Sequence, residues 1–167
     1  PGRMVSVNWL ENHFGEKVTA STYLGQYLFI YFGYGYCPDI CPTELANMAA
    51  TLDNLGSASA QVQPLFITVD PERDTVEFLS EYVAQFHPNF VGLTGTPAEI
   101  ASVAKNYRVF YRKVESEDSS EYLMDHSGFV YLMGPDGLFL TMFRGGTNPE
   151  SIGKTIATYI QKGKTGP

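Results

Sequence analysis

The feature that most constrains the fold is an uncharged apolar run followed at once by the two cysteines of the chain. Residues 27–32 are rich in aromatic and branched side chains and are bounded by polar or small residues. A short run of this composition predicts a strand buried on both faces, as in the centre of a sheet. The overlapping stretch 31–44 reads YFGYGYCPDICPTE and holds Cys37 and Cys41. The sequence therefore predicts a central strand, a turn that carries both thiols, and a helix.

The start of that helix is predicted from its proline. Pro42 suits the first helical position, where the missing N–H costs nothing, and this would place Cys41 near the N-cap. Glu44 would then occupy the third helical position, close to the positive end of the helix. The same field would favour a thiolate at Cys41. Cys37 lies one turn earlier, near enough to share an ion with Cys41 or to form a disulfide with it.

Length and charge limit the class of protein. The 167 residues suffice for one domain, and we expect a single domain over residues 1–167. The net charge of −7, with 11 scattered Lys and Arg residues, argues against nucleic acid as a partner. No apolar run approaches the ~20 residues that span a bilayer, so we expect a soluble part whose membrane anchor lies outside this chain. Two cysteines so close in sequence indicate catalysis or metal binding rather than a structural staple.

The rest of the chain alternates between strand and helix patterns. We expect a hairpin within residues 1–26, helices at 44–55, 74–86, 96–107 and 150–161, and strands at 62–69, 90–93, 127–133 and 138–143. Asp74 with Glu77, and Thr96 with Glu99, predict capping boxes. The polar stretch 115–121 predicts an exposed, mobile loop. This order predicts an α/β thioredoxin-like fold, with a central mixed β-sheet flanked by helices and an N-terminal β-hairpin insertion.

Copper is the metal that the cysteine pair suggests. Thiolates are soft ligands that select Cu(I), zinc or iron–sulfur clusters. Two sulfurs complete neither a zinc site nor a cluster, whereas two sulfurs and one imidazole suit copper. Three histidines are available: His13 in a polar turn, His87 before a proline at a helix end, and His126 between the acidic loop and an apolar strand. Spacing alone does not choose among them.

Several stretches resemble the Sco/SenC copper-binding proteins of cytochrome c oxidase assembly. They are YFGYGYCPDICPTE, PLFITVDPERDT, FVGLTGT, YRVFY and LMDHS, followed by YLMGPDG, in register over residues 27–159. The resemblance implies that Cys37, Cys41 and His126 are copper ligands and that Asp70 lies near the site and tunes it. For Asp70 the alternative is a turn cap without a role in the metal site. Gly35 stands where the family often has threonine, which suggests a more flexible turn.

The resemblance also implies a function. The protein would be a copper chaperone that carries Cu(I), with Cu(II) as the alternative, to the binuclear copper (CuA) centre of cytochrome c oxidase subunit II. Subunit II would be its main partner, with other copper chaperones or thioredoxin-like reductants as further ones. It would work in the bacterial periplasm, tethered to the cytoplasmic membrane, or in the mitochondrial intermembrane space.

Three alternatives need weighing. A thiol–disulfide oxidoreductase would use Cys37 and Cys41 to reduce the cysteines of subunit II. A copper or redox sensor would bind without transfer. A peroxiredoxin-like peroxidase is disfavoured, because Pro38 stands where those enzymes place a threonine. We therefore expect a metallochaperone rather than an enzyme, unless thiol–disulfide exchange is its activity.

Overall fold

A seven-stranded mixed sheet organises the fold. The computed structural model describes residues 10–37, 40–115 and 122–164. Across the sheet the strands are β2 (Lys17–Val18), β1 (Leu10–Asn12), β5 (Val91–Thr94), β4 (Val62–Thr68), β3 (Tyr27–Gly33), β8 (Phe129–Met133) and β9 (Phe139–Arg144). Strands β3, β4 and β5 run parallel, and the other pairs are antiparallel.

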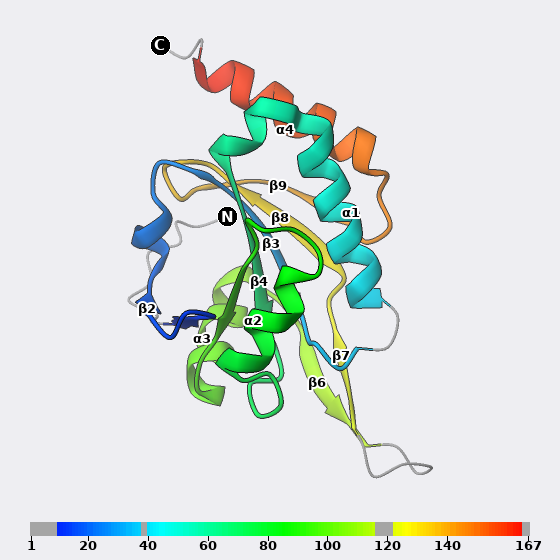
Figure 1. The fold of residues 1–167 in the computed structure, drawn as a ribbon. Coiled ribbons are helices and arrows are strands. Elements are labelled where there is room, and N and C mark those ends of the chain that lie inside the picture. The colour runs from blue at the N-terminus through cyan, green and yellow to red at the C-terminus, as the bar shows by residue number, and fades with distance from the viewer. Residues whose placement is uncertain (1–9, 38–39, 116–121, 165–167) are drawn as a thin grey trace.

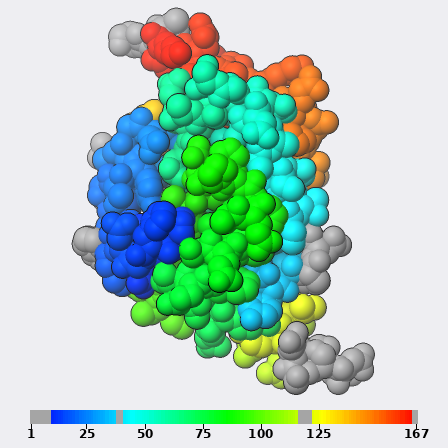
Figure 2. Space-filling model, in the orientation of Figure 1, coloured from blue at the N-terminus to red at the C-terminus, as the bar shows by residue number. Residues whose placement is uncertain are grey.

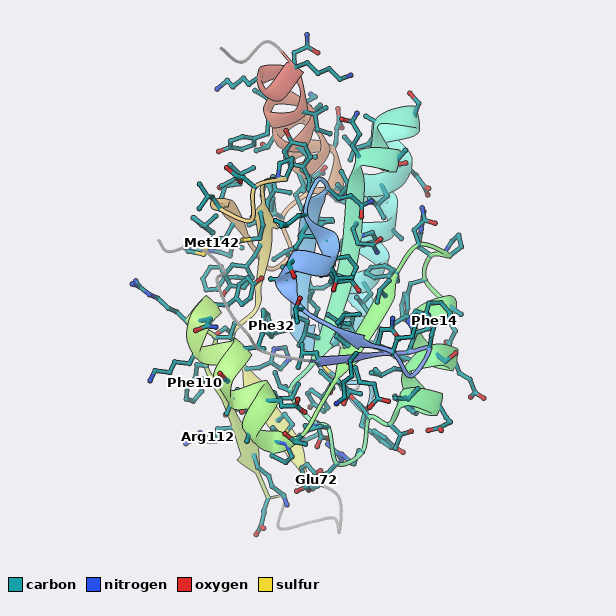
Figure 3. The ribbon with its side chains drawn as sticks, turned by 90° about the vertical axis from the view of Figure 1, so that its left-hand side faces the viewer. Phe14, Phe32, Glu72, Phe110, Arg112 and Met142 are labelled. Carbon is teal, nitrogen blue, oxygen red and sulfur yellow. The ribbon has the colours of Figure 1, made fainter. Side chains whose placement is uncertain are left out.

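Strand β3 is the buried centre of this sheet. All seven of its residues are buried, and it pairs with β4 on one edge and β8 on the other. Figure 3 shows Phe32 in the interior of the molecule. Since a strand enclosed on both faces and both edges has very little contact with water, an uncharged aromatic run suits it. The prediction for residues 27–32 is confirmed.

Helices cover both faces of the sheet. Helices α1 (Ile40–Leu55), α2 (Val76–Ala84) and α4 (Pro149–Lys164) lie on one face, and α3 (Pro97–Tyr107) lies on the other (Figures 1 and 3). The surface seen in Figure 2 is formed largely by α1 and α2 with the segment before β3. Two 3₁₀ turns, η1 (Ala20–Tyr23) and η2 (Gly56–Gln61), complete the connections. Among the described helices, none is long and apolar enough to cross a membrane.

This architecture confirms the predicted fold class. Helices flank a central mixed sheet, and the antiparallel pair β1–β2 is the predicted N-terminal hairpin, which joins the sheet through β5. The capping box at the start of α3 is also confirmed, since Thr96 and Glu99 exchange side-chain to backbone hydrogen bonds.

A second, two-stranded sheet stands apart from the first. Strands β6 (Tyr111–Val114) and β7 (Leu123–His126) pair antiparallel with each other, with Tyr111 opposite His126. The hairpin extends from one end of the molecule in Figure 1. Strand β7 was not predicted, because its residues alternate between exposed and half-buried and carry no apolar run. Most of the predicted loop, residues 116–121, lies outside the described part of the chain.

Two helix starts differ from the predictions. Helix α1 begins at Ile40, so Cys41 lies within its first turn and Glu44 is its fifth residue. The Glu44 carboxylate is buried and accepts the backbone N–H of Gly146 at 2.5 Å, which ties α1 to the loop before α4. A tertiary contact, rather than the helix terminus, therefore fixes this side chain.

The cap of α2 is Thr75 rather than Asp74. The Thr75 side chain accepts the backbone N–H of Phe78. Asp74 is fully buried instead, and its Oδ2 accepts the Thr68 hydroxyl at 2.6 Å and the Gly35 N–H at 2.9 Å. Asp74 and Thr75 are both residue types that cap helices. The Asp74 carboxylate instead accepts hydrogen bonds from Thr68 and Gly35, and Thr75 caps the helix.

Candidate metal centre

Two thiols and one imidazole converge at the end of β3. Ligand atoms of Cys37, Cys41 and His126 all lie within 4.8 Å of one another. Among the described residues, this is the one group of three or more His, Cys, Asp and Glu side chains placed closely enough to hold a metal ion. Cys37 lies in the loop after β3, Cys41 in the first turn of α1, and His126 at the end of β7.

The imidazole of His126 presents one particular nitrogen to the thiols. Its Nδ1 lies 3.0 Å from the backbone oxygen of Ser127, and its Nε2 lies 3.4 Å from Cys41 Sγ. Because a carbonyl oxygen only accepts, Nδ1 carries the proton in the neutral ring and Nε2 turns a lone pair toward the sulfur. This is how a histidine is usually oriented for metal ligation, through a hydrogen bond at its other nitrogen.

The two thiols differ in exposure. Neither is in a disulfide, but Cys37 is 9% exposed and Cys41 is completely buried. The backbone N–H of Cys41 donates to Cys37 Sγ at 3.4 Å. The hydrogen bond with Cys37 raises the pKa of the Cys41 thiol well above its usual range, and burial is the second-largest cause of this shift. The direction of this shift disfavours the predicted thiolate at Cys41 in the metal-free protein, because the hydrogen bond with Cys37 and burial oppose the field of the helix.

The other two histidines lie elsewhere. His13 is half-buried and its Nδ1 accepts the backbone N–H of Gly92, which links the first hairpin to β5. His87 accepts the backbone N–H of Asn89 after the end of α2. Both rings therefore have structural partners away from the thiols, and of the three histidines only His126 joins the cluster.

Asp70 is not a member of the cluster. It is 3% exposed, and its two carboxylate oxygens accept separate hydrogen bonds, from Arg73 Nε at 2.5 Å and from the Tyr122 hydroxyl at 2.7 Å. The plain alternative of a side-chain turn cap does not describe these contacts. Any influence of Asp70 on a bound metal would therefore act through the residues that it holds.

Aromatic rings form the wall of the site and were not predicted from the sequence. The Tyr31 hydroxyl donates to Cys41 Sγ at 3.7 Å, and burial raises the pKa of that phenol. The rings of Tyr31 and Tyr34 stand edge-on to the His126 imidazole, with centroids 6.0 and 5.8 Å apart. Both tyrosines lie just before the cysteines in sequence, so their proximity to the thiols could be predicted from the sequence. Their contact with His126 could not, because that residue is distant in sequence.

Two glycines allow the close packing of this wall. A β-carbon at Gly33 would lie 2.9 Å from Cys41 Sγ, nearer than real side chains approach. A β-carbon at Gly35 would collide with the ring of Phe78, and the Gly35 N–H is held by Asp74. The structure therefore gives Gly35 a packing role, while the flexibility suggested by its departure from the family pattern stays a prediction.

The chain is similar to several proteins of known sequence and structure. The family model described as SCO1/SenC matches residues 6–161. The human protein named "Protein SCO1 homolog, mitochondrial" is 44% identical over 154 residues, which are 91% of this chain and 51% of the human protein. The chain spans about half the length of the curated relatives it matches.

Two solved structures are similar in both fold and sequence. The crystal structure of Arabidopsis thaliana ScoI with copper bound has a TM-score of 0.87 and 44% identity, covering 92% of this chain and 96% of that one. The structure of Bradyrhizobium japonicum ScoI with copper bound has a TM-score of 0.83 and 39% identity, covering 90% and 96%.

Proposed function

The chain belongs to the SCO1/SenC family, and on that premise we propose that it binds copper through Cys37, Cys41 and His126 and delivers it during cytochrome c oxidase assembly. The observation that carries the proposal is the convergence of two cysteine thiols, neither of them in a disulfide, and one oriented imidazole nitrogen within 4.8 Å. Soft sulfur ligands favour Cu(I), and imidazole also suits copper. Two relatives have been seen with copper bound.

The burial of the three donors supports exchange of the ion rather than permanent storage. Cys37 is 9% exposed and His126 is half-buried, so an acceptor can approach from their side, while the buried Cys41 anchors the ion from within. The copper is cargo in this proposal. Its acceptor would be the binuclear CuA centre of oxidase subunit II, whose ligands would displace the less buried donors, Cys37 and His126, first.

The proposed place of action follows the relatives. The human relative is named as mitochondrial, and a comparably similar structure comes from a bacterium. We propose the mitochondrial intermembrane space, or the bacterial periplasm for a bacterial source, with a membrane tether. Other copper chaperones would load the site, and thioredoxin-like reductants would keep its thiols reduced.

Copper titration tests the proposal. Reduced protein should bind one Cu(I) per chain in competition with a strong Cu(I) chelator, and protein oxidised to the Cys37–Cys41 disulfide should bind none, because a disulfide offers no thiolate. The variant Cys37→Ser, which retains His126 and Cys41, serves as the matched control and should bind weakly. Equal affinity in the reduced and oxidised proteins would remove the thiols from the site and end the proposal.

A thiol–disulfide reductase is the second candidate, and one observation favours it. The partly exposed Cys37 stands beside the buried Cys41, as an attacking thiol and a resolving thiol would. Cys37 would attack a partner disulfide, and Cys41 would then displace the reduced partner, leaving a disulfide within this chain. This activity needs no copper and no histidine.

A further inference from the structure

A single cation contacts both segments that carry the proposed ligands. The guanidinium carbon of Arg73 lies 3.7 Å from the ring centroid of Tyr122, 4.9 Å from that of Tyr36 and 5.7 Å from that of Tyr34. Tyr34 and Tyr36 belong to the loop that leads into Cys37, whereas Tyr122 directly precedes β7. Arg73 therefore packs between the thiol-bearing loop and the histidine-bearing hairpin.

The carboxylate of Asp70 holds this arrangement together. It is 3% exposed and receives one donor on each oxygen, Arg73 Nε on Oδ2 and the Tyr122 hydroxyl on Oδ1. A buried carboxylate costs free energy unless it is paired and hydrogen-bonded, and bonds to a charged group are the stronger ones. Loss of either donor would therefore leave one oxygen of a buried carboxylate without its hydrogen bond, which is costly.

In the described part of the chain no strand ladder joins the hairpin to the main sheet, so side-chain contacts contribute to its placement. Strands β6 and β7 pair with each other in their own sheet, and the residues of β7 are exposed or half-buried. Tyr122 lies four positions before His126 on the same extended segment, about 13 Å at the usual strand rise. Fixing Tyr122 at one end of β7 restricts where His126 stands at the other.

We propose that Tyr122 and Arg73 are positioning residues that hold the His126 hairpin against the loop of Cys37, with Asp70 as the anchor between them. The inference rests on the proposed copper site and explains how Asp70 would influence it without touching the ion. None of the three is a ligand. Their effect would be on how well His126 is placed for the metal.

The test compares two hydroxyl deletions in one hairpin. Tyr122→Phe keeps the ring over Arg73 and removes the bond to Asp70. Tyr111→Phe is the matched control: its ring is half-buried in β6 directly opposite His126, and its hydroxyl has no hydrogen bond within the described residues. Arg73→Lys is the second variant, since it keeps the charge but loses the planar fork that stacks on rings.

The first measurement needs no metal. Amide hydrogen exchange in β6 and β7 of the reduced, copper-free protein should become faster in Tyr122→Phe and Arg73→Lys, and should stay at the parent rate in Tyr111→Phe. Exchange in β3 serves as the internal reference for global stability. Equal rates in Tyr122→Phe and the parent would overturn the proposal, whatever copper does.

The second measurement is copper binding by the same variants. Tyr122→Phe should bind Cu(I) roughly ten-fold more weakly, as removal of supporting partners of a metal ligand typically does. Its Cu(II) spectrum should shift part of the way toward that of His126→Ala. Faster hairpin exchange with an unchanged affinity and spectrum would refute a role in placing His126. Failure of the parent to bind copper would end the proposed function instead, while the exchange measurement would still decide whether Tyr122 and Arg73 hold the hairpin.

Discussion

The Nε2 atom of His126 lies 3.4 Å from the Sγ of Cys41, although 85 positions separate the two residues in sequence. The pairing of two strands explains this contact. Strand β3 precedes Cys41 and β8 follows His126, and the two strands are antiparallel neighbours with Tyr31 opposite Val130. Because antiparallel strands place the end of one beside the start of the other, the two ligand-bearing segments meet at the same edge of the sheet.

The difference in exposure between the two thiols predicts their order of reaction. In reduced, copper-free protein, a small neutral alkylating agent should label Cys37 before Cys41, because Cys41 is completely buried and its pKa is raised by its hydrogen bond with Cys37 and by burial. Limited alkylation followed by peptide mass spectrometry measures this. Preferential labelling of Cys41 would show that the helix field governs reactivity after all.

Gly33 should be intolerant of any side chain. In Gly33→Ala the new methyl group would lie 2.9 Å from Cys41 Sγ and 3.0 Å from atoms of both Phe66 and Tyr31. We expect a loss of about 1–3 kcal/mol in the free energy of unfolding, the usual cost of overpacking, together with weaker copper binding. Urea denaturation measures the first effect.

Gly128→Ala is the matched control for this substitution. Gly128 lies two residues after His126, and a β-carbon there meets no atom within 4 Å. It should unfold at nearly the parent urea concentration. Similar losses in the two variants would mean that general backbone effects, and not the contact with Cys41, limit position 33.

The core and the helix signals of this fold could be read from the sequence because they are local. The all-buried β3 follows from its uncharged composition, and the start of α3 follows from Thr96 and Glu99. The assignment of Asp74 to a helix cap failed because its partners, Thr68 and Gly35, come from other elements. Contacts of this kind depend on tertiary packing, which no local pattern records.

The residues of the candidate site likewise fall into those that the sequence indicates and those that only the fold brings together. The two cysteines stand out because of their spacing and their place after a buried strand, whereas no pattern of residues distinguishes His126 from His87. The family resemblance indicated His126, and the structure places it beside the thiols. The Arg73 contacts with three tyrosine rings join segments that are distant in sequence, so they were visible only in the fold.

Asp74 should make stability depend on pH. Burial raises the pKa of its carboxyl from 3.8 to about 6 in the folded protein. The folded state then holds this proton more tightly than the unfolded state, so the stabilising contribution is complete below about pH 4 and is lost as the pH rises through about 6. The shift corresponds to roughly 2–3 kcal/mol.

Comparison with Asp74→Asn isolates this contribution. The amide oxygen can still accept from Thr68 and Gly35, but it does not titrate. The difference in unfolding free energy between the parent and the variant should therefore move in favour of the variant from pH 4.5 to pH 7.5, as measured by urea denaturation. A difference that is constant over this range would show that Asp74 titrates normally.

His126→Ala separates the two candidate functions, because only one of them requires the imidazole. The side chain is half-buried at the end of a hairpin outside the main sheet, so its removal should leave the fold intact. Thiol–disulfide exchange depends on Cys37 and Cys41 alone and should continue at the parent rate with a model disulfide.

Copper held by two thiolates without the third donor should bind at least ten-fold more weakly, judged by chelator competition. His87→Ala is the control, since that ring accepts the N–H of Asn89 and does not belong to the cluster, and it should behave like the parent in both assays. The decisive measurement offers copper-loaded protein to a subunit II fragment whose cysteines have been reduced beforehand. If His126→Ala still metallates that fragment at the parent rate, delivery of copper is not the function of this site, and disulfide reduction is the better account of the same two thiols.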